Sequence, residues 1–178
     1  MLDGSPVSNT LTSNIEVSVM SRTDLATDLC TIARAAELFG DAWTLMILRE
    51  MFLGGRRFDD LQAQTGASPA TLSQRLRRMQ VAGVLRREAY STRPPRYEYR
   101  LTEKGRDLWP VLVAMKIWGD RWFGQTPPPV QIVHKQCGRT VVPELVCPDC
   151  GEPMQAHDAL PRLSEEFANA RACATEAV

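Results

Sequence analysis

Hydrophobic positions recur at helical spacing through most of the region from residue 23 to residue 123, which a single stretch of alternating positions interrupts. The first apolar series, spaced mostly three or four residues apart, consists of Leu25, Leu29, Ile32, Ala36 and Phe39. This spacing predicts an amphipathic helix. Gly40 suits the end of that helix, and Asp41 suits the N-cap of a second helix with Ile47 and Met51 on its apolar face.

Two shorter helices joined by a tight turn are predicted next. The first begins near Phe58 and stops near Gly66. Ser68 is a favourable N-cap for the second, and Pro69 takes the first helical position, where its missing N–H has no partner to lose. This second helix runs to about Ala82. Its inward-facing apolar side chains are Leu72, Leu76 and Met79. Its outer face is expected to carry Thr71, Gln74, Arg75 and Arg78.

After Gly83 the hydrophobic period changes from about 3.6 to 2, which indicates strands. Alternation over residues 85–90 and 96–101 predicts a β-hairpin, with residues 91–95 as its loop. Thr102 then suits the N-cap of a last long helix. The apolar stripe of that helix consists of Leu108, Leu112, Met115, Trp118 or Gly119, and Trp122.

This order of elements predicts a mainly α fold with a small β-hairpin, namely a winged helix-turn-helix domain followed by a small Cys/His ribbon-like module. The expected segments are a disordered tail at 1–22, the winged domain at 23–123, a Pro-rich linker at 124–130, the ribbon-like module at 131–160 and a C-terminal tail at 161–178. In such a fold the helix after the turn enters the major groove of DNA and the wing contacts the backbone or a minor groove.

Charge supports this interpretation only through its distribution. The 178-residue chain has a formal net charge of +0, yet residues 56–106 hold twelve basic and five acidic side chains. Arginine and glutamine side chains can bond base edges, and a helix N-terminus favours phosphate. The candidate DNA-binding residues are Arg57, Ser68, Thr71, Gln74, Arg75, Arg78, Arg93 and Arg96. Each of them alone is also compatible with an ordinary solvated surface.

A second cluster of chemistry-bearing residues follows the winged domain. His134 and Cys137 form one pair and Cys147 and Cys150 another, each with two intervening residues and a following glycine. Three thiolates and one imidazole suit a closed, structural zinc site, and the pattern resembles a miniature zinc ribbon. A reduced, metal-free hairpin and a Cys147–Cys150 disulfide remain alternatives.

Other features narrow the class of function. No apolar run approaches the ~20 residues that span a bilayer, and residues 1–20 lack the pattern of a secretory signal. We therefore expect a cytoplasmic protein with reduced cysteines. The sequence shows no nucleophile–base pair, phosphate loop or open metal site, so no enzymatic activity is expected.

The region from Cys30 to Trp122 resembles the HxlR-type regulators of bacteria. The resemblance rests on Gly40 and Trp43, Arg57-Phe58, Leu72-Ser73-Gln74-Arg75-Leu76, Gly83-Val84-Leu85-Arg86-Arg87, Pro95, Tyr97 to Thr102 with Gly105, and Trp118. It implies a homodimer built from the first and last helices, bound to a pseudo-palindromic operator, that represses or activates nearby genes.

The resemblance also draws attention to Cys30, the position at which some relatives sense oxidants or electrophiles. The alternative is that Cys30 is a small buried apolar residue. Two other functions of the same scaffold stay open at this point: a protein-interaction adaptor and a cysteine-based redox sensor.

Overall fold

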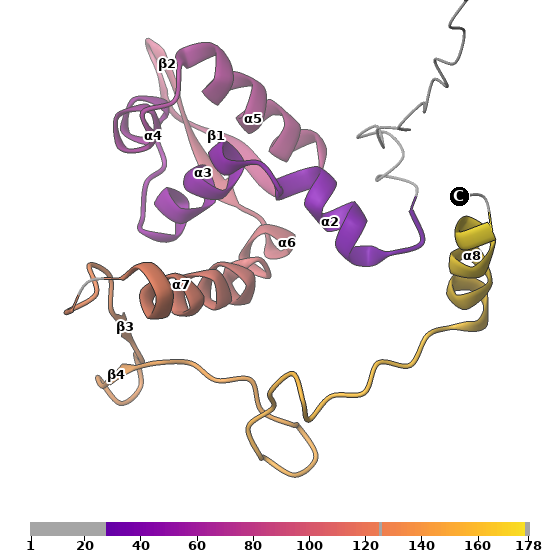
Figure 1. Ribbon diagram of the computed structural model, residues 1–178. Helices are drawn as coiled ribbons and strands as arrows, with labels where there is room; N and C mark the ends of the chain where they lie inside the picture. Colours follow the sequence, from indigo (N-terminus) through magenta and orange to yellow (C-terminus); the bar gives the residue numbers. More distant parts are fainter. Residues whose placement is uncertain (1–27, 125, 177–178) are drawn as a thin grey trace, which may run out of the picture.

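The computed structural model describes residues 28–124 and 126–176, and the element order follows the predicted one through the winged domain (Figure 1). The helices are α2 (Thr31–Phe39), α3 (Ala42–Phe52), α4 (Phe58–Thr65), α5 (Pro69–Val81), α6 (Glu103–Arg106), α7 (Trp109–Phe123) and α8 (Glu165–Glu176). The strands are β1 (Leu85–Thr92), β2 (Pro95–Leu101), β3 (Ile132–Val133) and β4 (Thr140–Val141). The mainly helical winged fold is thus confirmed, whereas the tail expected at 1–22 lies outside the described residues.

The hydrophobic core lies where α3, α4 and α5 meet the base of the hairpin. Its most deeply buried side chains are Ile47, Leu48, Leu61, Leu72, Leu76, Met79 and Val84. The inward stripe predicted for α5 is therefore confirmed. Because these residues come from three helices and from the turn that leads into β1, the core fixes the position of α5 against the rest of the domain.

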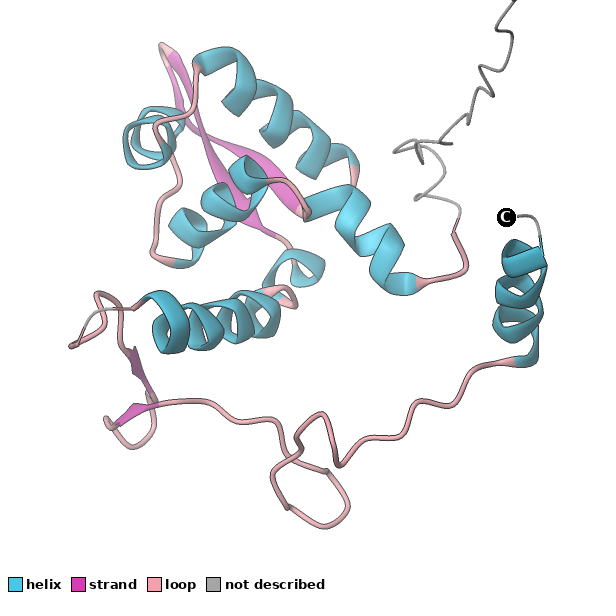
Figure 2. Ribbon diagram, viewed as in Figure 1, coloured by secondary structure: helices cyan, strands magenta, loops and turns pink. Residues whose placement is uncertain are grey.

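The wing is an antiparallel pair that runs from Leu85↔Leu101 at its base to Thr92↔Pro95 near its tip. The strands extend further than the alternation predicted, so only Arg93 and Pro94 lie between them, where residues 91–95 were expected to form the loop. Proline has no N–H to give to a ladder, but it is accepted as the first residue of a strand, as at Pro95. Figure 2 shows the hairpin beside α4 and α5.

The predicted long helix after Thr102 is interrupted. Thr102 does cap α6, because its Oγ1 accepts from the Gly105 N–H at 3.1 Å, but α6 ends at Arg106 and α7 begins at Trp109. Pro110 explains the break, since a proline lacks the N–H for an i→i−4 bond and its ring clashes with the carbonyl four residues earlier. The C-terminal tail also contains a helix, α8, which no pattern in the sequence predicted.

Gly105 is buried at the junction of α6 and the hairpin. A Cβ placed on it would lie 2.3 Å from the Val84 carbonyl oxygen and 3.0 Å from Leu101 Cδ2. We expect Gly105→Ala to lower the free energy of unfolding by about 1–3 kcal/mol, the usual range for overpacking. Urea denaturation measures this. The control is Gly119→Ala on α7, where a Cβ meets nothing within 4 Å of its own chain. Equal stability of Gly105→Ala and wild type would contradict the account.

Two helices present apolar side chains that nothing within residues 28–124 and 126–176 covers. None of the residues of α2 is buried, and Ile32, a member of its predicted apolar series, is 77% exposed. On α7, Leu112 packs against the core, but Trp118, Trp122 and Phe123 further along are 57%, 62% and 77% exposed. The first half of the predicted stripe on α7 therefore packs against the core, whereas its second half is exposed.

Candidate nucleic-acid interface

The turn between α4 and α5 places the start of α5 at the surface. Gly66 ends α4 in the left-handed region with φ 71°, and Ala67 is buried against the core. Ser68 Oγ then accepts from the Thr71 N–H at 3.2 Å and lies 2.9 Å from Thr71 Oγ1. Ser68 is thus the N-cap that the sequence predicted, and it holds the hydroxyl of the half-buried Thr71 in the cap.

Arg75 does not face outward. Its Nε donates to Asp41 Oδ1 at 2.9 Å, and each of these side chains is only 17% exposed. Asp41 is itself the N-cap of α3, where it accepts from the Thr44 N–H at 3.1 Å and the Thr44 hydroxyl at 2.6 Å. Arg75 therefore attaches α5 to the start of α3.

Arg78 makes a similar attachment one turn later. Its guanidinium bonds both the carboxylate and the backbone carbonyl of Glu37 on α2, and about a quarter of each side chain is exposed. The outward orientation predicted for Arg75 and Arg78 is therefore wrong. The physical reason is that α5 crosses the junction of α2 and α3, where two carboxylates are within reach of these arginines.

The face of α5 that remains open is rotated from the predicted one. Its exposed polar side chains are Ser73, Gln74 and Arg77. Gln74 was predicted, whereas Arg77 was missed. The sequence spacing could have identified Arg77. It lies four residues after Ser73 and therefore on the same face of α5, and each of these two residues directly follows a buried leucine, Leu72 or Leu76.

The wing and the start of α4 carry further exposed arginines. Arg93 and Arg96 are exposed at the wing tip, as predicted. Arg57 is exposed as well and lies 4.8 Å from the centroid of the Tyr90 ring, while Arg87 lies 3.6 Å from the Tyr97 ring. Such stacking orders the guanidinium groups without neutralising them.

Arg86 and Arg100, in contrast, are largely matched by acidic neighbours on the wing. Arg86 Nε lies 2.7 Å from Glu88, and Arg100 contacts Glu88 at 2.8 Å and Glu98 at 2.5 Å. The unmatched positive charge of the wing is therefore concentrated at the tip and on the side that faces α4.

Asp41 is the one group of this interface whose protonation is clearly perturbed in the described residues. Burial raises its pKa, but the hydrogen bonds from Thr44 and the ion pair with Arg75 outweigh that effect and hold the pKa of Asp41 below its usual value. The carboxylate stays charged at neutral pH, which keeps the link between α3 and α5 intact.

The predicted sensor Cys30 is the N-cap of α2 and is half-buried. Its N–H donates to Asp28 Oδ1 at 2.7 Å. The other four cysteines lie at position 137 or beyond, so the winged domain holds no second thiol. A sensing role for Cys30 stays a prediction.

The residues predicted to bind zinc are all described, but they do not meet in one place. His134 Nδ1 and Cys137 Sγ lie 3.3 Å apart. Within the described residues, no three His, Cys, Asp or Glu side chains converge on a point that could hold a metal ion. The N–H groups of Cys150 and Asp149, together with the Cys150 side chain, lower the pKa of the Cys147 thiol below its usual value.

With this geometry in view, the fold and exposed face define a winged helix-turn-helix DNA-binding protein. The model of the HxlR-like helix-turn-helix family matches residues 38–127, which is 90 of the 178 residues. The chain belongs to this family and is therefore a transcriptional regulator, not an enzyme. The match begins after Cys30 and ends before His134, so it supports neither the predicted sensing role of Cys30 nor the predicted zinc-ribbon-like module.

Named relatives extend the comparison. The chain is 44% identical over 138 residues to the HTH-type transcriptional regulator Rv3095 of Mycobacterium tuberculosis, which covers 77% of this chain and 87% of the relative. The crystal structure of the transcription factor PA1607 matches with a TM-score of 0.67 and 34% identity over 79% of this chain and 97% of that one. The structure of the transcription factor PA1374 of Pseudomonas aeruginosa matches with a TM-score of 0.53 and 36% identity, over 79% of this chain and 99% of that one.

Membrane insertion through a helix finds no support in the described residues, since none of their helices combines the length and the apolar character that a bilayer span requires.

Proposed function

We propose that the protein is a sequence-specific regulator that binds a pseudo-palindromic operator as a homodimer. In each half-site α5 enters the major groove and presents Ser73, Gln74 and Arg77 to base edges. The tip of the wing, with Arg93 and Arg96, contacts the backbone or an adjacent minor groove. The observation that carries this proposal is the exposure of Gln74 and Arg77 on a helix that two ion pairs hold to its neighbours.

The chemistry of these side chains fits direct readout. Glutamine can bond adenine with two hydrogen bonds, and arginine can bond guanine N7 and O6 in the same way. Rigid attachment matters as well, because a contact to a base edge selects a sequence only if the helix that carries it has a fixed position. Arg75 and Arg78 thus act as positioning residues that anchor α5, while Arg77 contacts DNA.

The dimer is supported by the apolar surface of α2 and α7. Ile32 on α2 and Trp118 and Trp122 on α7 are more than half exposed in one protomer. Several large exposed apolar side chains on two helices are typical of interaction sites, and a second copy would bury both helices symmetrically.

Substitution of Arg77 tests the proposed contact. Arg77→Ala is expected to weaken binding to a selected operator by about 5- to 150-fold, because a lost bidentate contact to a base costs about 1–3 kcal/mol. The thermal midpoint should not change, since Arg77 is exposed. Fluorescence anisotropy with labelled duplexes measures the affinity.

Arg162→Ala, which removes the same charge from an exposed position outside the winged domain, is the matched control and should bind as wild type does. An Arg77→Ala variant with wild-type affinity and sequence preference would contradict the contact. A wild type that binds no duplex even at low salt would instead favour the protein-interaction adaptor, because phosphate contacts should be strongest there.

A further inference from the structure

The two Cys/His pairs adopt the same turn, although the two residues between the paired positions differ. The His134 N–H donates to the Arg139 carbonyl at 2.9 Å, and the Cys147 N–H donates to the Glu152 carbonyl at 2.8 Å. The Gly138 and Gly151 N–H groups return to the carbonyls of His134 and Cys147, each at 2.8 Å. We call these turns, residues 134–139 and 147–152, the first and second knuckle.

Both knuckles also share their backbone conformation and their flanking pairing. Gly138 has φ 69° and Gly151 has φ 76°, a left-handed step that glycine takes without a Cβ penalty. The first knuckle is closed by the β3–β4 pair and the second by the Val146↔Pro153 bridge. Two unlike sequences therefore converge on a turn that directs side chains three residues apart to one side.

The paired side chains of the first knuckle already approach each other, since His134 Nδ1 lies 3.3 Å from Cys137 Sγ. Cys147 and Cys150 hold the equivalent positions of the second knuckle, whose backbone hydrogen bonds are the same. Each knuckle thus offers two of the four ligands that a tetrahedral zinc site requires.

The segment around the knuckles has no core to hold it together. None of residues 131–160 is buried, and Val142 and Leu145 between the knuckles are 70% and 76% exposed. A module of this size cannot bury enough apolar surface for stability and usually needs a disulfide or a metal. Its cysteines are unpaired in the structure.

We propose that the two knuckles close on one zinc ion bound by His134, Cys137, Cys147 and Cys150. The knuckles lie apart in the structure (Figure 1), so binding requires the second to move toward the first. Nine residues separate Cys137 from Cys147, enough chain for that movement. Each of the three thiols gives its proton to solvent as its sulfur bonds the ion, and a neutral imidazole nitrogen supplies the fourth bond.

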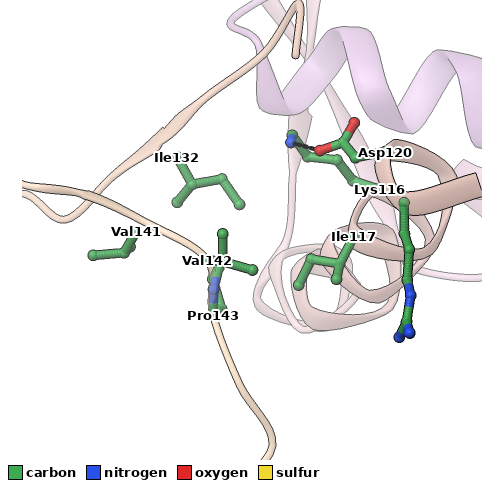
Figure 3. A pocket seen from close by; sticks show the side chains of 8 residues that line it. Lys116, Ile117, Asp120, Ile132, Val141, Val142 and Pro143 are labelled. Carbon is green, nitrogen blue, oxygen red and sulfur yellow. Dashed lines mark hydrogen bonds and ion pairs between the residues drawn. The ribbon is translucent and has the colours of Figure 1, made fainter. Parts of the chain in front are cut away.

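The residues that flank the first knuckle lie next to α7 of the winged domain. The β3–β4 hairpin faces α7 across a hollow of about 300 Å³ lined by Ile117, Ile132, Val141, Val142 and Pro143, with the Lys116–Asp120 ion pair beside it (Figure 3). A zinc ion that fixes the knuckles would therefore order a module that rests on the helix proposed to form the dimer.

Metal content tests the proposal directly. Full-length protein produced with added zinc and purified without chelator should contain roughly one zinc per chain by elemental analysis. Cys147→Ser and Cys137→Ser should lose the ion, whereas Cys173→Ser, which removes an exposed cysteine outside the knuckles, should retain it. Protein loaded with Co²⁺ instead should show the intense visible absorption of a tetrahedral thiolate site.

A second readout does not depend on metal analysis. Chelator should increase hydrogen exchange at residues 131–160 and leave the core of α3 and α5 unchanged. Wild-type protein without zinc or Co²⁺ absorption, or with a Cys147–Cys150 disulfide under reducing purification, would overturn the proposal. These measurements use DNA-free protein, so they are independent of the proposed operator binding.

Discussion

Trp118→Asp combined with Trp122→Asp is expected to convert the proposed dimer into a monomer and to weaken binding to the proposed operator by about 100-fold or more. The two indoles are 57% and 62% exposed on α7 and would be buried by a second copy. A buried, unpaired carboxylate in such an interface is costly. Because a dimer holds two half-sites at once, loss of the partner removes the gain from linked binding, which is about 10²–10⁴-fold.

Sedimentation equilibrium gives the mass of the variant, and anisotropy gives its operator affinity. The control is Leu160→Asp, which places a charge of the same sign on a 91% exposed apolar residue that belongs to neither α2 nor α7. Circular dichroism should show both variants folded, since neither indole belongs to the core. A double variant that stays dimeric with full affinity would show that the dimer uses another surface.

Asp41→Ala is expected to lower the free energy of unfolding by about 3 kcal/mol. About 1 kcal/mol is the usual value of an N-cap, and a hydrogen bond to a charged group contributes about 1.5–3 kcal/mol. The variant loses the cap on α3 and leaves the guanidinium of Arg75, 17% exposed, without its carboxylate. Urea denaturation followed by circular dichroism measures the change.

Asp41→Asn separates the two contributions, because asparagine caps a helix about as well as aspartate but carries no charge. Asp41→Asn should lower the free energy of unfolding by about 1–2 kcal/mol. The pKa of Asp41 is lowered in the folded state, so its charge stabilises the fold above the usual carboxyl pKa, about 3.9, and this stabilisation is lost as the pH falls through the folded value. The difference in the free energy of unfolding between wild type and Asp41→Asn should be constant near pH 6 and shrink below about pH 4.

The elements of the winged domain could be predicted from sequence because local signals agree with the packing. Asp41 and Ser68 cap the helices that follow them, as their residue types indicated. The buried stripe of α5 follows from the spacing of Leu72, Leu76 and Met79. Such signals act over a few residues and survive tertiary folding.

The roles of the arginines on α5 could not be predicted in the same way. The orientations of Arg75 and Arg78 depend on Asp41 and Glu37, which lie 34 and 41 residues away in the sequence. The periodicity of a sequence does not indicate such contacts. Arg77 takes part in neither of these two ion pairs and is the exposed arginine of α5. The spacing of the Cys/His pairs likewise indicated two turns, but not whether they meet.

Selection of bound sequences from a random duplex library, with wild type and Arg77→Ala in parallel, tests the central claim that the exposed face of α5 reads DNA. We predict that wild type selects a pseudo-palindrome with half-sites about one helical turn, 10–10.5 bp, or a multiple of it apart. Arg77→Ala should lose its preference at equivalent positions of both halves and keep the rest. An unchanged sequence logo for Arg77→Ala, or no enriched sequence for wild type, would contradict the account.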